Sequence, residues 1–315
     1  MRIALVTEEL VPSSASTAYV ARELAGRLSN DHDVLVLAGG RGLPTFHGAR
    51  IFWAGRMTPV SSVREAMALF KPDVCHLLEP HRLGLKAAEA ADRLGVRTLC
   101  LPPESWLPGV DGGAHHPGLR DEALHEAWSG AVDPGPEGQW GRTVVGYVGS
   151  LDRRRVVQRL ARMTRLTGVR LTVLGDGPGA DHLREHGAEV ITSASGADRS
   201  RCIASFDVLV QPRKKETYAP AVLEALASGV PVVAFDSGAA GLVVRHEHNG
   251  LLVDRDRGGR ALARTVLRLA ASPRLRSSLG ERARPSVATR TWDEALSQLV
   301  DVHYRESPCP WARSG

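Results

Sequence analysis

Two glutamates eight residues apart form the pattern in this sequence that most clearly points to chemistry. Glu216 lies in a polar stretch after an apolar run, and Glu224 lies in a helical pattern that begins near Ala219 and ends at Gly229. Pro220 suits the first turn of a helix, where its missing N–H is not needed and the remaining amides favour a bound phosphate. A carboxylate beside such an anion site can accept hydrogen bonds from the vicinal hydroxyls of a sugar. The pattern therefore favours a phosphorylated sugar or a nucleotide as ligand.

The residues around this pair matter because acidic residues occupy 35 of the 315 positions, so the spacing alone is weak evidence. The segment resembles the signature of the retaining glycosyltransferases of GT-B form, family-4 type. The matching residues are Glu216, Tyr218, Ala219, Glu224, Ala225, Ser228, Gly229, Pro231, Val232 and Val233. The resemblance implies that Glu216 is the catalytic contact to the donor sugar and phosphates. It also implies that Tyr218 and Ala219 line the donor site and that Glu224 binds the nucleotide ribose.

Basic side chains are the next requirement that the resemblance implies, because this family uses them in place of a metal to stabilise the departing diphosphate. The family has an Arg and, five positions later, a Lys, where this chain has Ser150 and Arg155. One cation is therefore lost at Ser150, while Arg153 and Arg154 stand next to Arg155. We expect Ser150, Arg154 and Arg155 to bind the donor, with Arg153 or Arg154 reaching the diphosphate. A solvated basic surface is the alternative interpretation of the three arginines.

Short apolar runs alternate with helix-patterned segments along the chain, which is typical of parallel sheets wound with helices. The first half has expected strands at 3–6, 34–37, 73–78 and 97–101, and expected helices at 18–28 and 83–94. The second half has expected strands at 143–148, 170–174, 189–192, 207–210 and 230–235, and expected helices at 156–165, 180–186, 219–227, 259–271 and 292–304. We therefore predict an α/β protein of GT-B form, with two Rossmann-like domains facing across a cleft and the first one truncated.

Pro and Gly interrupt the periodic patterns between 101 and 139, apart from a helical piece at 119–128, which indicates an interdomain connection. The expected domains are a shortened acceptor-side domain at 1–108, a connector at 109–141, a donor-binding domain at 142–289, and a terminal helix with a tail at 290–315 that returns to the first domain.

The first domain departs from the family pattern in three ways. Roughly two βα units, on the order of 60 residues, are absent, and they normally carry a histidine loop facing the transferred sugar. No histidine here takes that role, since His115 and His116 are expected to be exposed in the connector and His76 to be packed in a strand. The family's glycine loop is replaced by residues 12–16, where serine narrows the approach of the backbone to a phosphate.

Missing sheet-edge units expose apolar flanks, which predicts a homo- or hetero-oligomer in which a partner covers them. The alternative to an active enzyme is a degenerate, non-catalytic homologue that binds nucleotide or docks on an active partner.

Composition excludes several other classes of protein. Hydrophobic residues at 43% and charged residues at 24% are typical of a soluble globular chain. A net charge of +5 and a pI near 9.3 are compatible with phosphorylated ligands. Aromatic residues make up only 5% and the arginines are spread evenly, which argues against nucleic-acid binding. Gly39, Gly40 and Gly42 lead into Pro44 and not into a helix, so the dinucleotide-binding fingerprint of an NAD enzyme fails.

The cysteine spacing, the N-terminal segment and the length of the apolar runs indicate the cellular compartment. Four scattered cysteines form no zinc motif and no disulfide framework. The N-terminus lacks the order of a signal peptide and no apolar run reaches membrane-spanning length, which predicts a cytoplasmic protein. Peripheral membrane contact through 60–70 stays open, although Met67, Leu69 and Phe70 are expected to belong to the core.

The whole pattern predicts a hexosyltransferase that moves a hexose from a nucleotide diphosphate sugar, GDP-mannose or a UDP-sugar, to an unknown acceptor. The resemblance implies retention of configuration and no metal or other cofactor. Residues 117–128 and 290–292 are similar to the GDP-mannose-dependent mannosyltransferases of actinobacteria.

Overall fold

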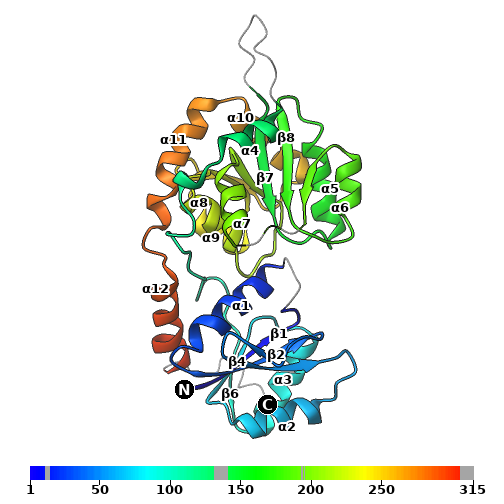
Figure 1. Cartoon of the computed structure of the whole chain (residues 1–315), viewed down its shortest axis with the longest axis vertical. Coiled ribbons are helices and arrows are strands. Elements are labelled where there is room, and N and C mark those ends of the chain that lie inside the picture. The colour runs from blue at the N-terminus through cyan, green and yellow to red at the C-terminus, as the bar shows by residue number, and fades with distance from the viewer. Residues whose placement is uncertain (11–14, 131–140, 193, 195, 306–315) are drawn as a thin grey trace, which may run out of the picture. The chain divides into compact units, whose positions relative to one another are not determined.

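The computed structural model describes residues 1–10, 15–130, 141–192, 194 and 196–305. The chain divides into two compact units, which are Met1–Trp106 with Ala295–Gly315 and Leu107–Glu294 (Figure 1). Residues 12–14 of the serine loop and Cys309 lie outside the described residues. We describe each unit by itself as the first unit and the second unit.

The first unit is built on a sheet in the order β3-β4-β2-β1-β5-β6, in which all pairs except β3–β4 are parallel. Its strands are β1 (Arg2–Thr7), β2 (Asp33–Gly39), β3 (Thr45–Phe46), β4 (Ala49–Ala54), β5 (Val74–Leu77) and β6 (Arg97–Leu99). Its helices between strands are α1 (Ser16–Leu28), α2 (Val60–Phe70) and α3 (Arg82–Arg93). The expected strands and helices are present, and β3 and β4 are additions that the sequence did not predict.

Helices cover both faces of this sheet, which is why its central strands are continuous apolar runs. Val6 and Leu37 belong to a core cluster with Met67 of α2 and Leu83 of α3, while α1 lies on the opposite side of the sheet (Figure 1). Met67 and Phe70 are buried as expected. The expectation for Leu69 was wrong, because it is 78% exposed on the outer face of α2.

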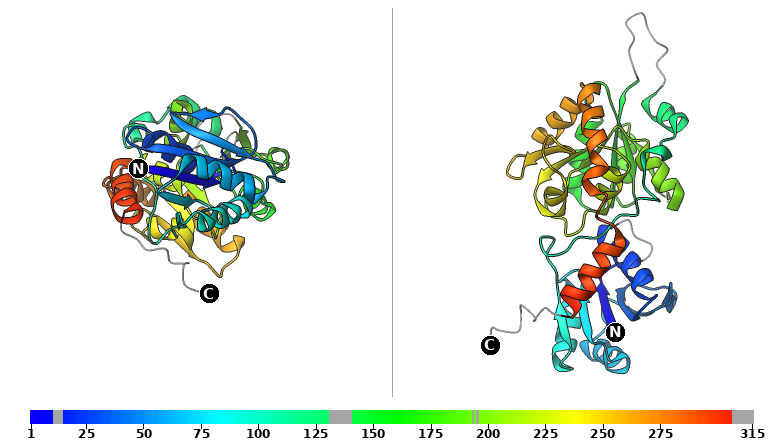
Figure 2. Two further views of the ribbon diagram at one scale, coloured as in Figure 1. Left: turned by 90° about the horizontal axis from the view of Figure 1, so that it is seen from below. Right: turned by 90° about the vertical axis from the view of Figure 1, so that its left-hand side faces the viewer.

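The terminal segment of the chain completes the first unit. It consists of the end of α12 (Trp292–Ser297) and a π-helix, Gln298–Tyr304 (Figure 2). Trp106 Nε1 donates to the carbonyl of Ala295 at 2.8 Å, and Tyr304 Oη lies 2.9 Å from Nδ1 of His76. His76 is packed in β5 as expected, and burial, with a smaller contribution from His303, lowers its pKa to about 3.

The second unit contains a parallel sheet in the order β12-β11-β10-β7-β8-β9. Its strands are β7 (Thr143–Val148), β8 (Val169–Leu174), β9 (Glu189–Ile191), β10 (Val208–Gln211), β11 (Val232–Asp236) and β12 (Gly250–Asp254). Its helices are α4 (Glu122–Ser129), α5 (Arg154–Met163), α6 (Ala180–Glu185), α7 (Gly196–Ala204), α8 (Pro220–Ala227), α9 (Gly238–Val243), α10 (Gly259–Ala270) and α11 (Pro273–Ala283), with 3-10 turns at Pro117–Leu119 and Pro285–Val287.

Successive side chains of these strands enter two different cores, as the period of a strand requires. Val145 and Val210 pack in one cluster with residues of α5 and α10, whereas Val144 and Leu209 pack in the other with residues of α8. Both faces of the sheet are therefore largely apolar, with Thr172 of β8 as a buried polar exception.

The residues expected to form a separate connector are part of the second unit. Leu107, Val110 and Trp128 belong to its core, and the ring of Trp128 lies 5.6 Å from that of Phe206. Because these apolar residues pack in its core, the second unit begins at Leu107 and not after the connector.

Asp207 ties α4 to the sheet. Its carboxylate accepts hydrogen bonds from the Val144 amide at 2.8 Å, His125 Nε2 at 3.0 Å and Arg120 Nη2 at 3.2 Å. Burial alone would raise the pKa of Asp207, but the hydrogen bonds and charges of these partners bring the pKa below its usual value. The Asp207 amide also donates to the Val144 carbonyl at 2.9 Å, so the backbone and the side chain of Asp207 together hold the start of β7.

Among the described residues, no helix is both long enough and apolar enough to cross a membrane.

Candidate functional site

The second sheet reverses its strand order between β7 and β10, and ligands of parallel sheets bind at the carboxyl ends of strands beside such a switch point. Ser150 follows β7 and Glu216 follows β10, so the two loops leave neighbouring strands at the same edge. Arg154 and Arg155 open α5 after the Ser150 loop, and Ala219 precedes α8. The topology thus brings the predicted donor-binding residues to one edge of one sheet.

Glu216 lies half-buried in the loop that joins β10 to α8. Its carbonyl accepts a hydrogen bond from the Ala239 amide at 2.9 Å. Gly238 has a φ of +59°, and a Cβ atom there would lie 2.8 Å from the Glu216 carbonyl oxygen. Only glycine fits this close approach without strain, so the start of α9 fixes the backbone from which the Glu216 carboxylate projects.

Glu224 is almost completely buried in α8, with 2% of its side chain exposed. Arg199 of α7 donates from Nη2 to Glu224 Oε2 at 2.6 Å, and Nε2 of His115 lies 3.8 Å from Oε1. His115 was expected to be exposed, and this expectation was wrong. The histidine is buried because the connector packs into the second unit, where its ring meets this carboxylate. Sequence reasoning missed both partners, since neither stands in the glutamate motif.

The start of α8 agrees with the local sequence. Ala219 occupies the N-cap position, Pro220 stands in the first turn, and Gly229 adopts a φ of +74° just past the helix end. Tyr218 and Ala219 are both buried, and Tyr218 has no exposed surface. The Tyr218 side chain can therefore contact a sugar donor only if the loop moves. The backbone amides of this turn could contact the donor without such a movement.

A network of polar groups joins the ends of β7 and β10. The Ser150 carbonyl accepts hydrogen bonds from Tyr147 Oη at 3.0 Å and from Arg213 Nη2 at 3.0 Å. The hydroxyl of Ser150 donates to Asp152 Oδ1 at 2.7 Å. Burial raises the pKa of Tyr147 to about 12, so its phenol stays protonated and can act as a donor at neutral pH. Sequence reasoning missed Tyr147 and Arg213, although Arg213 stands three residues before Glu216.

The basic triplet at the start of α5 faces water. Arg153, Arg154 and Arg155 are all exposed, and the ion pairs found among the described residues do not include them. Arg159, one turn further along, donates to the Pro212 carbonyl and lies 5.0 Å from the ring centre of Phe235. Burial, followed by the charge of Arg155, lowers the pKa of Arg159. Positive charge is therefore dense where α5 meets the end of β10.

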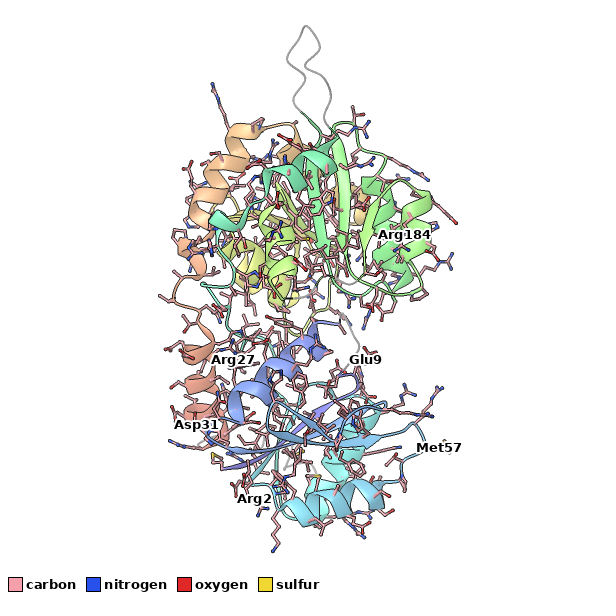
Figure 3. The ribbon with its side chains drawn as sticks, viewed as in Figure 1. Arg2, Glu9, Arg27, Asp31, Met57 and Arg184 are labelled. Carbon is pink, nitrogen blue, oxygen red and sulfur yellow. The ribbon has the colours of Figure 1, made fainter. Side chains whose placement is uncertain are left out.

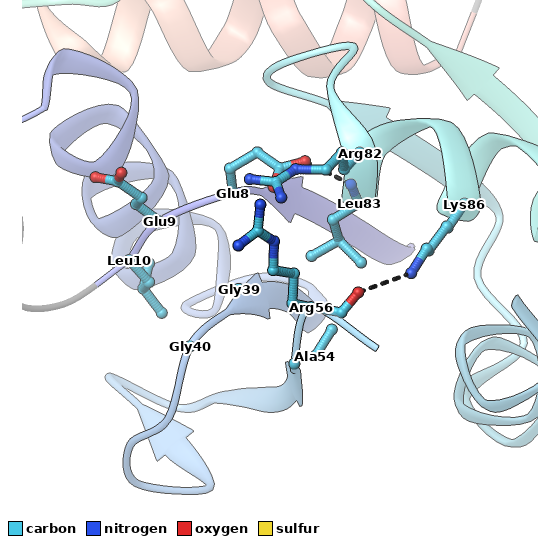
Figure 4. A pocket seen from close by; sticks show the side chains of 11 residues that line it. Glu8, Glu9, Leu10, Gly39, Gly40, Ala54, Arg56, Arg82, Leu83 and Lys86 are labelled. Carbon is cyan, nitrogen blue, oxygen red and sulfur yellow. Dashed lines mark hydrogen bonds between the residues drawn. The ribbon is translucent and has the colours of Figure 1, made fainter. Parts of the chain in front are cut away.

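The first unit has a cavity of about 400 Å³ at the corresponding edge of its own sheet. It lies beyond the ends of β1, β2 and β4 and at the start of α3 (Figure 4), and its charged lining residues are Glu8, Glu9, Arg56, Arg82 and Lys86. Figure 4 shows the guanidinium groups of Arg56 and Arg82 pointing into the space beside Glu8.

Two contacts shape this cavity. The Glu8 carboxylate accepts a hydrogen bond from the Leu83 amide in the first turn of α3. Lys86 Nζ donates to the Thr58 carbonyl at 2.7 Å, which holds the loop after β4 against α3. Met57 on this loop is 90% exposed and points outward (Figure 3). The loop is therefore anchored by its backbone, while its side chains stay available.

The described residues contain no group of three or more His, Cys, Asp or Glu side chains arranged to hold a metal ion.

Relatives of the chain agree with this architecture. Residues 142–272 match the family model of the group 1 glycosyl transferases. The chain is similar to the GDP-mannose-dependent alpha-mannosyltransferase of Mycolicibacterium smegmatis, with 30% identity over 376 residues that cover 96% of this chain and 97% of the relative. The protein of the same name from Corynebacterium glutamicum is 27% identical over 377 residues, covering 97% and 89%. Both alignments are longer than the chain, so the relatives contain residues that have no counterpart here.

Solved structures show the same fold at low identity. HepE from Anabaena in complex with UDP and glucose superposes with a TM-score of 0.72 at 15% identity, covering 96% of this chain and 98% of that chain. Sucrose-phosphate synthase from Thermosynechococcus elongatus gives a TM-score of 0.69 at 16% identity, covering 96% and 98%. With the fold shared by these structures and 30% identity to a relative along nearly its whole length, the chain belongs to the group 1 glycosyltransferases of GT-B fold.

Proposed function

We propose that this glycosyltransferase moves a mannosyl group from GDP-mannose to a hydroxyl group of an acceptor, with retention of configuration and without a metal ion. The observation that carries the proposal is the position of Glu216 at the carboxyl edge of the second sheet, beside the switch point between β7 and β10. The choice of donor is supported by the relatives named as GDP-mannose-dependent alpha-mannosyltransferases, which match 96–97% of the chain.

In this proposal the loop between β10 and α8 holds the donor. The amides at the start of α8 receive the phosphates, since a helix N-terminus carries partial positive charge. Glu216 accepts hydrogen bonds from hydroxyls of the transferred sugar. A carboxylate has about four acceptor positions, so Glu224 can keep its bond from Arg199 and also accept the ribose hydroxyls once the residues that bury it move aside.

The acceptor is assigned to the cavity of the first unit. Arg56 and Arg82 provide donors, and Glu8 and Glu9 provide acceptors, within about 400 Å³. Paired donors and acceptors of this kind suit a compound with several hydroxyl groups, because each hydroxyl both donates and accepts. We therefore propose a polyhydroxylated acceptor. The oligomer and the peripheral membrane contact expected from the sequence stay predictions.

The decisive experiment follows nucleotide release. Purified protein is incubated with GDP-mannose, GDP-glucose, UDP-glucose or UDP-galactose, each with mannose oligosaccharides, methyl α-mannoside or myo-inositol as acceptor. We expect GDP release from GDP-mannose with an α-linked product seen by NMR. Glu216→Gln should lower the rate by ~10²-fold or more, since it removes charge that faces the reacting sugar, and its circular dichroism should match that of the wild type.

Other outcomes would contradict this function in different ways. Tight binding of GDP-mannose by calorimetry without transfer to any acceptor would favour the non-catalytic homologue. Preferred release of UDP would overturn the donor assignment. A β-linked product would overturn retention.

A further inference from the structure

Arg213 is a mostly buried cation at the switch point of the second sheet. It follows β10 directly after Pro212, and 13% of its side chain is exposed. Its backbone amide donates to the Gln211 side chain at 3.3 Å, and its Nη2 donates to the Ser150 carbonyl at 3.0 Å. Its Nε lies 3.4 Å from Tyr147 Oη, at the outer limit of a hydrogen bond. The guanidinium is therefore held from both neighbouring strands, β7 and β10.

Burial lowers the pKa of Arg213, but Tyr147, Glu216 and Asp152 raise it by more, so the pKa lies above its ordinary value and the guanidinium stays charged. Asp152 Oδ1 lies 3.5 Å from Nη2, but the Asp152 side chain is 56% exposed, and an ion pair screened by water to that extent is weak. Tyr147 stays neutral at pH 7, since burial raises its pKa to about 12. Glu216 is the other carboxylate whose charge acts on Arg213. Arg213 thus brings a positive charge beside the residue that the proposed function places at the donor sugar.

The hydrogen bonds of Arg213 leave part of the guanidinium available. Nε and Nη2 use their donors on Tyr147 and Ser150, and among the described residues no hydrogen bond from Nη1 is found. Arginine presents its five N–H groups in a planar fork that matches phosphate oxygens. A fork held on one side by protein groups, with donors left on the other, is preorganised for an anion and loses little entropy when it binds one.

The resemblance to the family implies an arginine at position 150, where this chain has Ser150. The Arg213 guanidinium donates a hydrogen bond to the Ser150 carbonyl, so its positive charge lies beside residue 150 although Arg213 follows the neighbouring strand β10. We propose that Arg213 binds the diphosphate of the nucleotide sugar and stabilises the negative charge that develops on it during transfer, in place of the missing residue-150 cation.

This inference rests on the proposed function, and the chemical step is the one that function requires. The bond from the sugar C1 to the β-phosphate oxygen breaks, and its electron pair passes to the phosphate. The acceptor oxygen forms the new bond to C1, and its proton is taken up by the released diphosphate. Arg213 acts on the leaving phosphate, where preorganised donors lower the barrier.

The test compares ligands that differ by one phosphate. Calorimetry measures the affinity of GDP and of GMP for the wild type, Arg213→Gln and Arg213→Lys. Gln can still donate to the Ser150 carbonyl but carries no charge. We expect Arg213→Gln to weaken GDP by ~10–100-fold, as loss of a charged hydrogen bond does, and to weaken GMP by less than about threefold. Arg213→Lys should keep most of the preference for GDP.

Two control variants distinguish the effect of the Arg213 charge from a structural effect on the Ser150 loop. Arg184→Gln removes an exposed arginine of α6 (Figure 3), which pairs with Asp181, and should change neither affinity. Ser150→Arg in the Arg213→Gln background restores a guanidinium at the same place and should recover part of the GDP affinity. Thermal unfolding of each variant shows whether the fold is kept.

Three results would overturn the inference. Equal weakening of GDP and GMP in Arg213→Gln would show that Arg213 only holds the Ser150 loop. Unchanged GDP affinity in a folded Arg213→Gln, with the wild type still preferring GDP over GMP, would remove Arg213 while leaving the proposed function intact. Failure of the wild type to bind either nucleotide would remove the proposed function and this inference together.

Discussion

The two units place charge differently around sheets of similar topology. Each sheet reverses its strand order next to its first strand, between β1 and β5 in the first unit and between β7 and β10 in the second. At this edge the first unit has a cavity lined by exposed arginines, Arg56 and Arg82. The second unit instead holds Glu224 and Arg213 mostly buried, each bonded to other side chains or backbone groups. These two charges of the second unit therefore contribute to packing, besides the donor binding that is proposed for them.

In the first unit, the charged side chains at this edge can change with little effect on stability. In the second unit, a change in a buried charge should alter stability as well as the proposed function. An exposed arginine can change without loss of folding, because a surface ion pair is worth little. A buried carboxylate cannot, because its removal leaves a partner without compensation in a medium of low polarity. Five variants, including two controls, and a pH titration test this contrast, from the largest expected effect to the smallest.

The largest effect is expected from Glu224→Leu. Removing the carboxylate leaves the guanidinium of Arg199, which is 22% exposed, without its 2.6 Å partner. We expect the free energy of unfolding to fall by about 3 kcal/mol, at the lower end for buried pairs because Arg199 reaches water. Denaturant titration measures the change.

A double variant is the control for this prediction. Arg199→Met combined with Glu224→Leu should recover part of the loss, since both charges of the ion pair are then removed. A loss below about 1 kcal/mol for the single variant would mean that the second unit tolerates the loss of a buried ion pair as well as the first unit tolerates the loss of exposed charges.

Acid should weaken the first unit through His76. The folded-state pKa of about 3 lies below the ordinary value of 6.5, so neutral His76 stabilises the fold above pH 6.5 and this stability is lost as the pH falls toward 3. About 2 kcal/mol should be lost between pH 6.5 and pH 5, at 1.36 kcal/mol per pH unit. Thermal unfolding across this range measures it, and His76→Asn, which does not titrate, should flatten the profile. An equally steep profile in His76→Asn would assign the acid sensitivity to other groups.

A smaller effect is expected from Asp207→Asn in the second unit. The amide keeps the shape of the carboxylate but loses the charge that receives His125 and Arg120. We expect a loss of about 1–2 kcal/mol at pH 7, since hydrogen bonds to a charged group are stronger than neutral ones. Because the folded-state pKa is lowered, this stability is present above the unfolded-state pKa and lost as pH falls through the folded one. The difference between variant and wild type should therefore shrink in acid, as urea titrations at pH 7 and pH 3.5 would show.

The smallest change in stability is expected from Arg56→Ala and Arg82→Ala together. Both side chains are exposed, so the free energy of unfolding should stay within about 0.5 kcal/mol of the wild type. Acceptor KM should nevertheless rise, with the KM for GDP-mannose unchanged, once the donor and acceptor screen has provided a working assay. A fall in stability as large as that of Glu224→Leu would remove the contrast between the units.

Sequence reasoning predicted the buried strands of both sheets well. Runs such as 143–148 are apolar on both faces and end at glycine, so periodicity and length agree with β7. It missed β4, which lies between β2 and the two-residue edge strand β3, because β4 mixes Arg50 and partly exposed aromatic residues with buried alanines at its ends, and no clear alternation results. Local pattern identifies a strand that is buried on both faces better than one near the sheet edge.

The candidate site was predictable only where its residues follow one another in the chain. Glu216 and Glu224 stand in one continuous motif, whereas Arg199 and His115 reach the site through the packing of separate elements. His115 shows the reason most clearly. Its neighbours are Gly and Pro, which predict an exposed loop, but the apolar residues Leu107 and Val110 bury the connector in the second unit. Packing between residues far apart in the sequence determines the environment of His115, and the local composition does not predict it.

The contacts that α12 and the terminal π-helix make with the first unit affect the order in which the protein folds during synthesis. Residues 107–294 are contiguous, so the second unit can fold as soon as they have left the ribosome. The first unit needs Ala295 and Tyr304 to cover Trp106 and His76, and these partners are the last part of its core to be made. The portion translated first is therefore completed last, and truncation near residue 294 should leave a folded second unit beside an unfinished first one.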